Sequence, residues 1–215
     1  MADQTITTTA IGRTSAPPDE VDLQFAARAV DPDVTTARRT AADQALALRQ
    51  ELDAMGIPDE RIRTSQFRIQ QRPPDRRGPS ASDSTSQPYQ ATEIISVVLF
   101  DLDRLGDVLS AAVDEAGVEI NEVAFTFQTE TQRDLRQKAI ADAVVTARKN
   151  ATAAATAEDM FVGSVQSIVT DPGSRPRRLR AGQALAMETA ESGSVESGPI
   201  EVSVSVDVEY RLEEP

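Results

Sequence analysis

Two neighbouring carboxylates, Asp19 and Glu20, follow a rigid Pro-Pro step near the start of the chain. A pair of carboxylates can hold a hard cation or share the acid and base roles of glycoside hydrolysis. Both kinds of site need the two side chains to converge. Adjacent residues of a strand point to opposite faces, so these two diverge. We therefore interpret the stretch as a turn between two strands, with Gly12, Pro18 and Asp19 as its structural residues.

A second acidic segment, DLDRLGD at residues 101–107, superficially resembles a calcium-binding loop. An EF-hand loop ends in a bidentate acidic residue at its twelfth position. Counted from Asp101, that position is Ala112. The segment is better interpreted as the beginning of a helix capped by Asp101 or Asp103.

Two groups of arginines are a candidate anion-binding site. They lie in Pro-, Gly- and Ser-rich stretches at about 72–88 and 171–198, which we predict to be mobile loops. Clustered arginines can bind phosphate or RNA, but aromatic residues are not interleaved with these. Two interpretations stay open: solvated loops, or loops that meet around an anionic ligand. The arginines are Arg72, Arg76, Arg77, Arg175, Arg177, Arg178 and Arg180.

The residue inventory excludes several classes of enzyme. The chain has no cysteine, which removes disulfides, thiolate catalysis and Cys-based zinc sites. It has no histidine, so Ser-His-Asp triads, zincins and facial-triad iron sites are excluded as well. Nucleotide-binding glycine motifs and a GxSxG elbow are also missing. We predict no catalytic residue, no metal site and no cofactor, and hence that the protein is not an enzyme.

The charge composition points to the environment of the protein. The formal net charge is −13, and the cations comprise 20 Arg and only two Lys, Lys138 and Lys149. Such a surface repels nucleic acid, and strong salt screens its self-repulsion. We hypothesise a halophilic source and predict that nucleic acid is not a partner.

The N-terminal residues MADQTITTTA lack the basic and apolar regions of a signal peptide. No run approaches 18 apolar residues, so we expect no membrane span. The sequence predicts a cytoplasmic protein, with envelope association as the alternative if a leader has been removed.

Hydrophobic periodicity predicts ten elements. Strict alternation in the last strand, and weaker alternation in the others, indicates sheets with one wet face. The order is β-β-α-β-β-α-β-α-β-β, which favours an α+β fold with a largely antiparallel sheet and long helices packed on it. Two separable cores are not evident, so a single domain over residues 1–215 is expected. The strands are predicted at 5–11, 20–30, 61–70, 89–100, 118–128, 162–169 and 199–212, and the helices at 33–55, 101–117 and 131–159.

Several local predictions can be checked directly. The strand at 20–30 should pair antiparallel with the first strand, and the strand at 89–100 should be central in the sheet. Asp33 should cap the first helix and Gly56 should end it. The third helix should be capped by Thr131, with a core stripe of Leu135, Ala139, Val144, Ala147, Ala151 and Ala154. In the strand at 61–70, Ser65, Phe67 and Ile69 should share one face, while Arg61, Arg63 and Arg68 indicate a wet opposite face.

Taken in order, five segments resemble the SIMPL-domain family, also called DUF541, which includes the bacterial 26-kDa periplasmic immunogenic proteins. The resemblance covers roughly residues 5–212. It implies an α+β fold with a mainly antiparallel sheet, a tendency to form ring-like or channel-like oligomers, and no catalytic residues. The segments are TTTAIGRTSAPPDEVDLQFAARA, LRQELDAMGIPDERIRTSQFRIQ, YQATEIISVVLFDLDRLGDVLSAAVDEAGVEINEVAFTF, RQKAIADAVVTARKNATAAA and GPIEVSVSVDVEYRL.

Two functions are therefore expected from different classes. The first is a non-enzymatic, self-associating protein of the family, serving envelope maintenance or stress tolerance. The second is a module that binds an anionic ligand or a partner through the two Arg-bearing loops.

Overall fold

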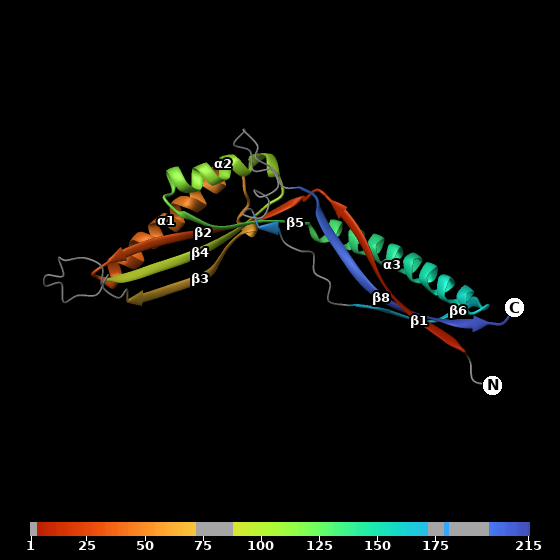
Figure 1. Cartoon of the computed structure of the whole chain (residues 1–215). Coiled ribbons are helices and arrows are strands. Elements are labelled where there is room, and N and C mark those ends of the chain that lie inside the picture. Colours follow the sequence, from red (N-terminus) through yellow and green to blue (C-terminus); the bar gives the residue numbers. More distant parts are fainter. Residues whose placement is uncertain (1–3, 72–87, 172–178, 181–197) are drawn as a thin grey trace, which may run out of the picture. The chain divides into compact units, whose positions relative to one another are not determined.

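The computed structural model describes residues 4–71, 88–171, 179–180 and 198–215. These residues form two compact units (Figure 1). The first unit is assembled from residues 1–18, 126–179 and 197–215, and the second from residues 19–125 and 180–196. Each is described below by itself.

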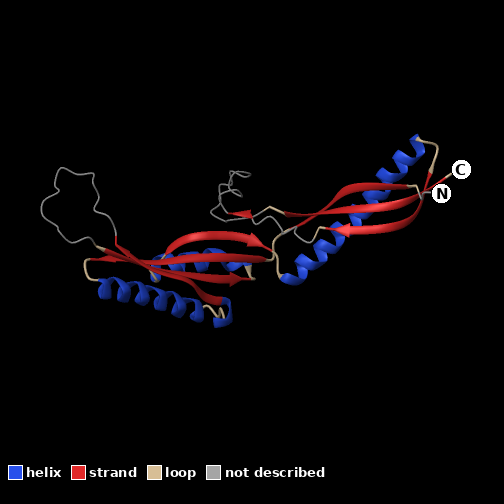
Figure 2. Ribbon diagram, turned by 90° about the horizontal axis from the view of Figure 1, so that it is seen from below, coloured by secondary structure: helices blue, strands red, loops and turns tan. Residues whose placement is uncertain are grey.

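The second unit has a five-stranded sheet with the order β3-β4-β2-β5-β7. Strand β4 pairs antiparallel with both β2 and β3, so it is an interior strand, although β2 and not β4 is the middle strand of the five. Helix α1 packs along one face of the sheet (Figure 2). The elements are β2 (Glu20–Asp31), α1 (Val34–Ala54), β3 (Ile62–Gln71), β4 (Tyr89–Leu99), α2 (Leu105–Ser110), β5 (Glu119–Thr126) and β7 (Leu179–Arg180).

The first unit has a three-stranded antiparallel sheet with the order β1-β8-β6 and one long helix, α3. Alternation along β8 buries every second residue from Ile200 to Tyr210, as the sequence pattern predicted. The elements are β1 (Thr5–Ala16), α3 (Thr129–Ala157), β6 (Phe161–Thr170) and β8 (Ile200–Glu213).

Helix α1 begins and ends as its sequence predicts. The carboxylate of Asp33 accepts hydrogen bonds from the Thr36 N–H at 2.8 Å and from the Thr36 hydroxyl at 3.0 Å. These bonds satisfy a helix-terminal donor and lower the pKa of Asp33. At the other end Gly56 adopts φ +73°, the left-handed conformation that favours glycine. Both predicted ends of this helix are confirmed.

Helix α3 differs from its prediction in two respects. It begins after Gln128, whose side chain makes no capping hydrogen bond, so the prediction of a Thr131 cap was wrong. Its core stripe contains Ala143 and Ala155 instead of Val144 and Ala154, because the buried row keeps a strict spacing of four. The buried residues are Leu135, Ala139, Ala143, Ala147, Ala151 and Ala155.

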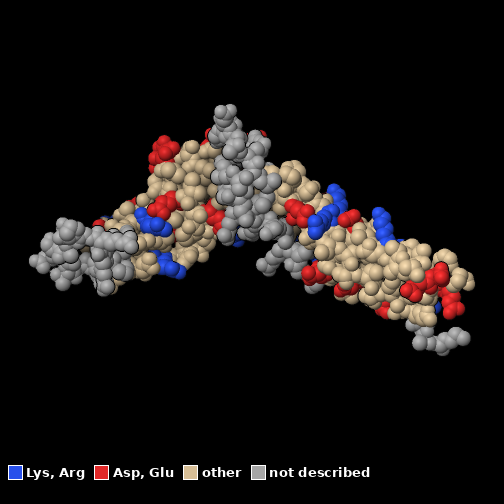
Figure 3. Space-filling view, in the orientation of Figure 1, with Lys and Arg blue, Asp and Glu red and all other residues tan. Residues whose placement is uncertain are grey.

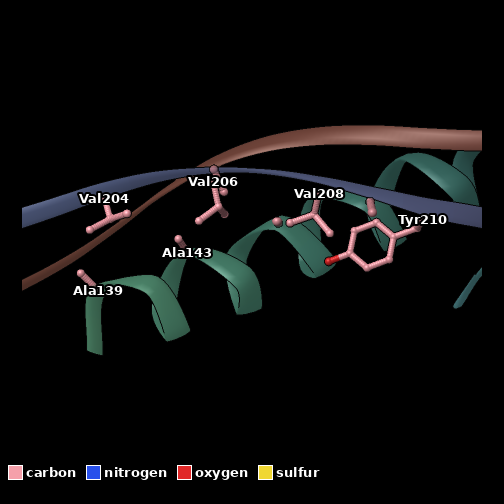
Figure 4. Close-up of a cluster of buried hydrophobic side chains, with 9 residues drawn as sticks. Ala139, Ala143, Val204, Val206, Val208 and Tyr210 are labelled. Carbon is pink, nitrogen blue, oxygen red and sulfur yellow. The ribbon is translucent and has the colours of Figure 1, made fainter. Parts of the chain in front are cut away.

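The core of the first unit is thin (Figure 4). The alanines of α3 face the valines of β8, and Tyr210 lies beside them with its hydroxyl buried and without a hydrogen-bond partner among the described residues. Because Ala carries a single methyl group, the helix lies close to the strands.

Three predictions about strand topology need correction. Strands β1 and β2 do not pair; β1 pairs with β8 and β2 pairs with β4, so they lie in different sheets. The expected single sheet is two sheets. Gly12 is not part of the turn, because β1 continues to Ala16 and the connection contains Pro17, Pro18 and Asp19. Local alternation identified the strands, but it carries no information about which distant strand is the partner.

The α+β class and the order of the seven long strands and three helices are confirmed for the described residues. The single domain over 1–215 stays a prediction, although the described residues show two cores where the pattern indicated one. Among the described residues, no helix has the length and apolar character needed to cross a membrane. Nearly all of the two predicted loops, 72–88 and 171–198, lies outside the described residues.

Candidate functional site

Most of the arginines of the predicted anion site cannot be placed. Arg72, Arg76 and Arg77, and likewise Arg175, Arg177 and Arg178, lie outside the described residues. Arg180 is part of the two-residue strand β7, and its side chain is not described. A site built from both loops therefore stays a prediction.

Pro18 and Asp19 lie in the connection between β1 and β2, and their role as turn residues stays a prediction. The structure adds no support for a site made of the carboxylates of Asp19 and Glu20. Glu20 is the first residue of β2, and Asp19 lies in the connection before it. Within the part of the chain that the structure describes, no three His, Cys, Asp or Glu side chains gather as a metal site would require.

The calcium-loop alternative is likewise unsupported, because residues 102–104 form a short 3-10 helix that leads into α2. Neither Asp101 nor Arg104, the residues before the two helical turns, makes a side-chain capping bond, so the predicted Asp cap was wrong.

Gly12 has a different role from the one predicted. It lies within β1 at the point where α3 crosses the strand. A Cβ atom there would collide with the backbone of Ala139 and lie 2.9 Å from Cα of Ala143. Because glycine has no side chain, it permits the helix and the strand to approach closely. This role differs from the turn that was predicted for Gly12.

The face of the five-stranded sheet that α1 leaves free carries a polar array. Cross-strand register places Arg28 and Arg68 on either side of Thr92, on β2, β3 and the intervening β4. The neighbouring row joins Gln90 to Gln70. These residues, with Gln66 and Ile94, line an open depression of about 190 Å³.

A β-bulge decides which side chains of β3 join this array. The register shifts between Thr64 and Gln66, leaving Ser65 unpaired. The shift puts Arg63 and Arg68 on the same face and sends Phe67 to the opposite one. The predicted separation of the arginines from Phe67 and Ile69 is thereby confirmed for Arg63 and Arg68, whereas Arg61 precedes the strand.

The two arginines of the array differ in whether their side chains have a charged partner. Arg28 forms an ion pair with Glu119 at 2.9 Å. The guanidinium of Arg68 makes no hydrogen bond or ion pair with a residue that the structure describes. On the face shown in Figure 3, Lys and Arg side chains lie in small groups close to Asp and Glu side chains. The depression therefore holds one arginine that is paired with a carboxylate and one that is not.

The second candidate surface is the edge strand β6 of the first unit. Four large apolar side chains are exposed there: Phe161 (61%), Val165 (42%), Ile168 (48%) and Val169 (58%). Val165 and Ile168 pair with Tyr210 and Val208, so they share the face of the sheet on which α3 packs. Their exposure shows that α3 leaves this edge of the sheet uncovered.

The opposite edge, β1, is covered. The Arg13 N–H donates to the carboxylate of Asp142 at 3.1 Å, and the Thr8 hydroxyl donates to the Ala147 carbonyl at 3.0 Å. Together with the close approach of α3 to Gly12, these contacts show that α3 lies toward β1 and away from β6. As far as the described residues go, the helix covers one edge of the sheet and leaves the other open.

The alternation of Gln66, Arg68 and Gln70, and of Gln90 and Thr92, could have revealed the polar face from the sequence. The participation of Arg28 could not, because it depends on the pairing of β2 with β4.

Comparison with known proteins identifies the family of the chain. No curated protein matches the chain. The family model described as SIMPL, protein of unknown function (DUF541), matches residues 6–210 and so includes residues of both units. The alanine-rich helix, which carried part of the resemblance in the sequence, lies within that span, and so do the opening and closing strands except for their outermost residues. The chain therefore belongs to the SIMPL (DUF541) family.

Proposed function

We propose that this protein is a non-enzymatic, self-associating member of its family and that two copies pair through strand β6. The observation that carries the proposal is the open edge of the first unit's sheet. Residues 161–170 contain no charged residue and no proline, although 27% of the chain is charged.

Such an edge is unusual for a protein that stays monomeric. Edge strands present unpaired N–H and C=O groups, and soluble proteins normally protect them with charges, prolines or a covering element. Here the covering helix lies over β1 instead. The exposed Ile168 and Val169 add apolar area that pairing would remove from water.

A second copy is the best-matched occupant of this edge. The β1 edge of another copy is closed by the Arg13–Asp142 hydrogen bond, which leaves β6 against β6. Two identical antiparallel strands related by a two-fold axis form a closed, self-complementary interface. Register shifts interrupt β6 between Val162 and Ser167, so Ser167–Thr170 is the regular segment available for pairing.

Light scattering over a range of protein concentrations in molar KCl tests the proposal. The wild-type protein should be a dimer or larger. Val169→Lys places a charge on the open edge and should shift the protein to a monomer. Val145→Lys is the matched control, since Val145 is similarly exposed (53%) but lies on α3. A wild-type protein that is monomeric at every concentration contradicts the proposal, as does equal dissociation by both variants.

The cellular role is a further part of the proposal. Family resemblance favours envelope maintenance or stress tolerance. The cytoplasmic location and the alternative of envelope association after loss of a leader both remain predictions from the sequence. The second predicted function, an anion-binding module built from the two Arg-bearing loops, has no support from the described residues, because nearly all of those arginines lie outside them.

A further inference from the structure

We propose that the second unit binds a small oxyanion, a carboxylate or phosphate group carried by a hydroxylated molecule, on the free face of its sheet. The site is the open depression on strands β2, β4 and β3. Arg28, Thr92 and Arg68 are cross-strand neighbours on these three strands, and all of them line it. It belongs to the second unit, whereas β6 belongs to the first, and its described lining uses none of the seven arginines of the two predicted loops. The inference therefore stands independently of the proposed self-association.

Spacing and charge favour an anion. Arg28 and Arg68 are two strands apart, which places their backbones about 10 Å from each other. Guanidinium groups on long side chains can converge from that distance on one oxyanion, and they donate in a planar fork that suits carboxylate and phosphate oxygens. Among the residues that the structure describes, those that line the depression include these two cations and no carboxylate.

The state of the two arginines indicates a site ready to accept a ligand. The guanidinium of Arg68 has no carboxylate or carbonyl partner among the described residues, whereas that of Arg28 pairs with Glu119 at 2.9 Å. An incoming anion would engage Arg68 directly and compete with Glu119 for Arg28. Glu119 is therefore inferred to oppose anion binding.

The remaining lining residues favour a hydroxylated carrier. Gln66, Gln70 and Gln90 each offer an amide that can donate and accept, and Thr92 offers a hydroxyl. The Gln90 amide already reaches the Thr92 hydroxyl at 3.4 Å, so these groups lie within range of one another. A volume of about 190 Å³ is small compared with clefts for drug-sized ligands, and suits a single sugar-sized molecule.

The bulge at Ser65 supports the assignment. Without the extra residue, continued alternation would place Phe67 and Ile69 on this face and turn Gln66, Arg68 and Gln70 away. The bulge thus gathers the polar side chains of β3 opposite Thr92 and Gln90, at a sheet location where bulges commonly redirect side chains.

Calorimetric titration of the full-length protein with glucuronate, glucose 6-phosphate and uncharged glucose tests the proposal. Backbone amide shifts of Gln66, Arg68 and Thr92 in NMR spectra would locate the binding. At least one charged sugar should bind and glucose should not, and raising the salt should weaken binding. Binding of glucuronate alone or of glucose 6-phosphate alone would identify a carboxylate or a phosphate site respectively.

Two variants should change the binding affinity in opposite directions, and a third should leave it unchanged. Arg68→Gln should weaken binding by roughly ten-fold or more, because a charge-assisted hydrogen bond is lost. Glu119→Gln should tighten it several-fold by releasing Arg28, which loss of folding could not imitate. Arg63→Gln is the matched control, since Arg63 lies on the same strand and face but outside the depression. The proposal is overturned if neither charged sugar binds, if glucose binds equally well, or if Arg63→Gln weakens binding as much as Arg68→Gln.

Discussion

Each of the two units packs a long helix on a sheet, but the two helices do so in different ways. Helix α1 buries Ala37, Ala41 and Ala45 and then Leu48 and Leu52, which fill the space above β2 and β4 with side-chain volume. Helix α3 buries one leucine followed by five alanines at strict spacings of four. It lies directly against the backbone of β1 at Gly12.

The difference predicts opposite sensitivities. A core filled by large side chains is damaged mainly by removing atoms, since cavities form. A core made by close backbone approach is damaged mainly by adding atoms, since the helix must move away. The offset of α3 toward Gly12 also leaves β6 exposed, which is the basis of the proposed pairing of two copies.

The largest expected effect is in the second unit. Leu48→Ala should lower the free energy of unfolding by about 3 kcal/mol, because Leu48 is fully buried and its truncation leaves a cavity. Urea denaturation followed by circular dichroism measures the change. Leu46→Ala, at an exposed position of the same helix, should change the free energy by under about 0.5 kcal/mol. Similar losses for both variants would show that α1 does not pack as described.

The next largest effect is in the first unit. Gly12→Ala should lower the free energy of unfolding by about 2 kcal/mol, because the added methyl group meets the backbone of α3 and cannot be relieved by a side-chain rotation. Gly106→Ala is the control, since a Cβ at Gly106 meets nothing within 4 Å. That control should be neutral or slightly stabilising, because alanine favours helix more than glycine does. If Gly12→Ala is as stable as the wild type, the close approach of α3 to β1 is wrong.

The smallest effect concerns the helix ends. Asp33 caps α1, whereas the side chain of Gln128 makes no capping bond at the start of α3. Because the folded pKa of Asp33 is lowered, its stabilisation is present above the ordinary carboxyl pKa and is lost as the pH falls through the folded value. Asp33→Ala should therefore lower the melting temperature at neutral pH and have less effect in acid.

Asp33→Asn is the matched variant, since asparagine caps helices without titrating. It should keep most of the neutral-pH stability and show a weaker dependence on acid than the wild type. An unchanged melting temperature for Asp33→Ala at neutral pH would contradict the capping role.

The local elements were predictable for identifiable reasons. The Asp33 cap, the left-handed Gly56 and the alternation from Ile200 to Tyr210 each depend on residues close in sequence. The prediction for Gly12 failed because a glycine within a strand and a glycine in a turn look alike until the crossing helix is known. Part of the polar site was visible as alternation in β3 and β4, but its other half on β2 was not.

The sequence by itself determined the family, the α+β class, the order of the elements and the inventory without Cys and His. Tertiary structure alone decided that β1 and β2 belong to different sheets, that Arg28 and Arg68 flank Thr92, and that β6 is left open. The physical reason is range: caps, turns and periodicity act over a few residues, whereas strand pairing and helix placement join residues far apart in the chain. Those long-range contacts are selected by the fit of whole surfaces, which no short stretch of sequence contains.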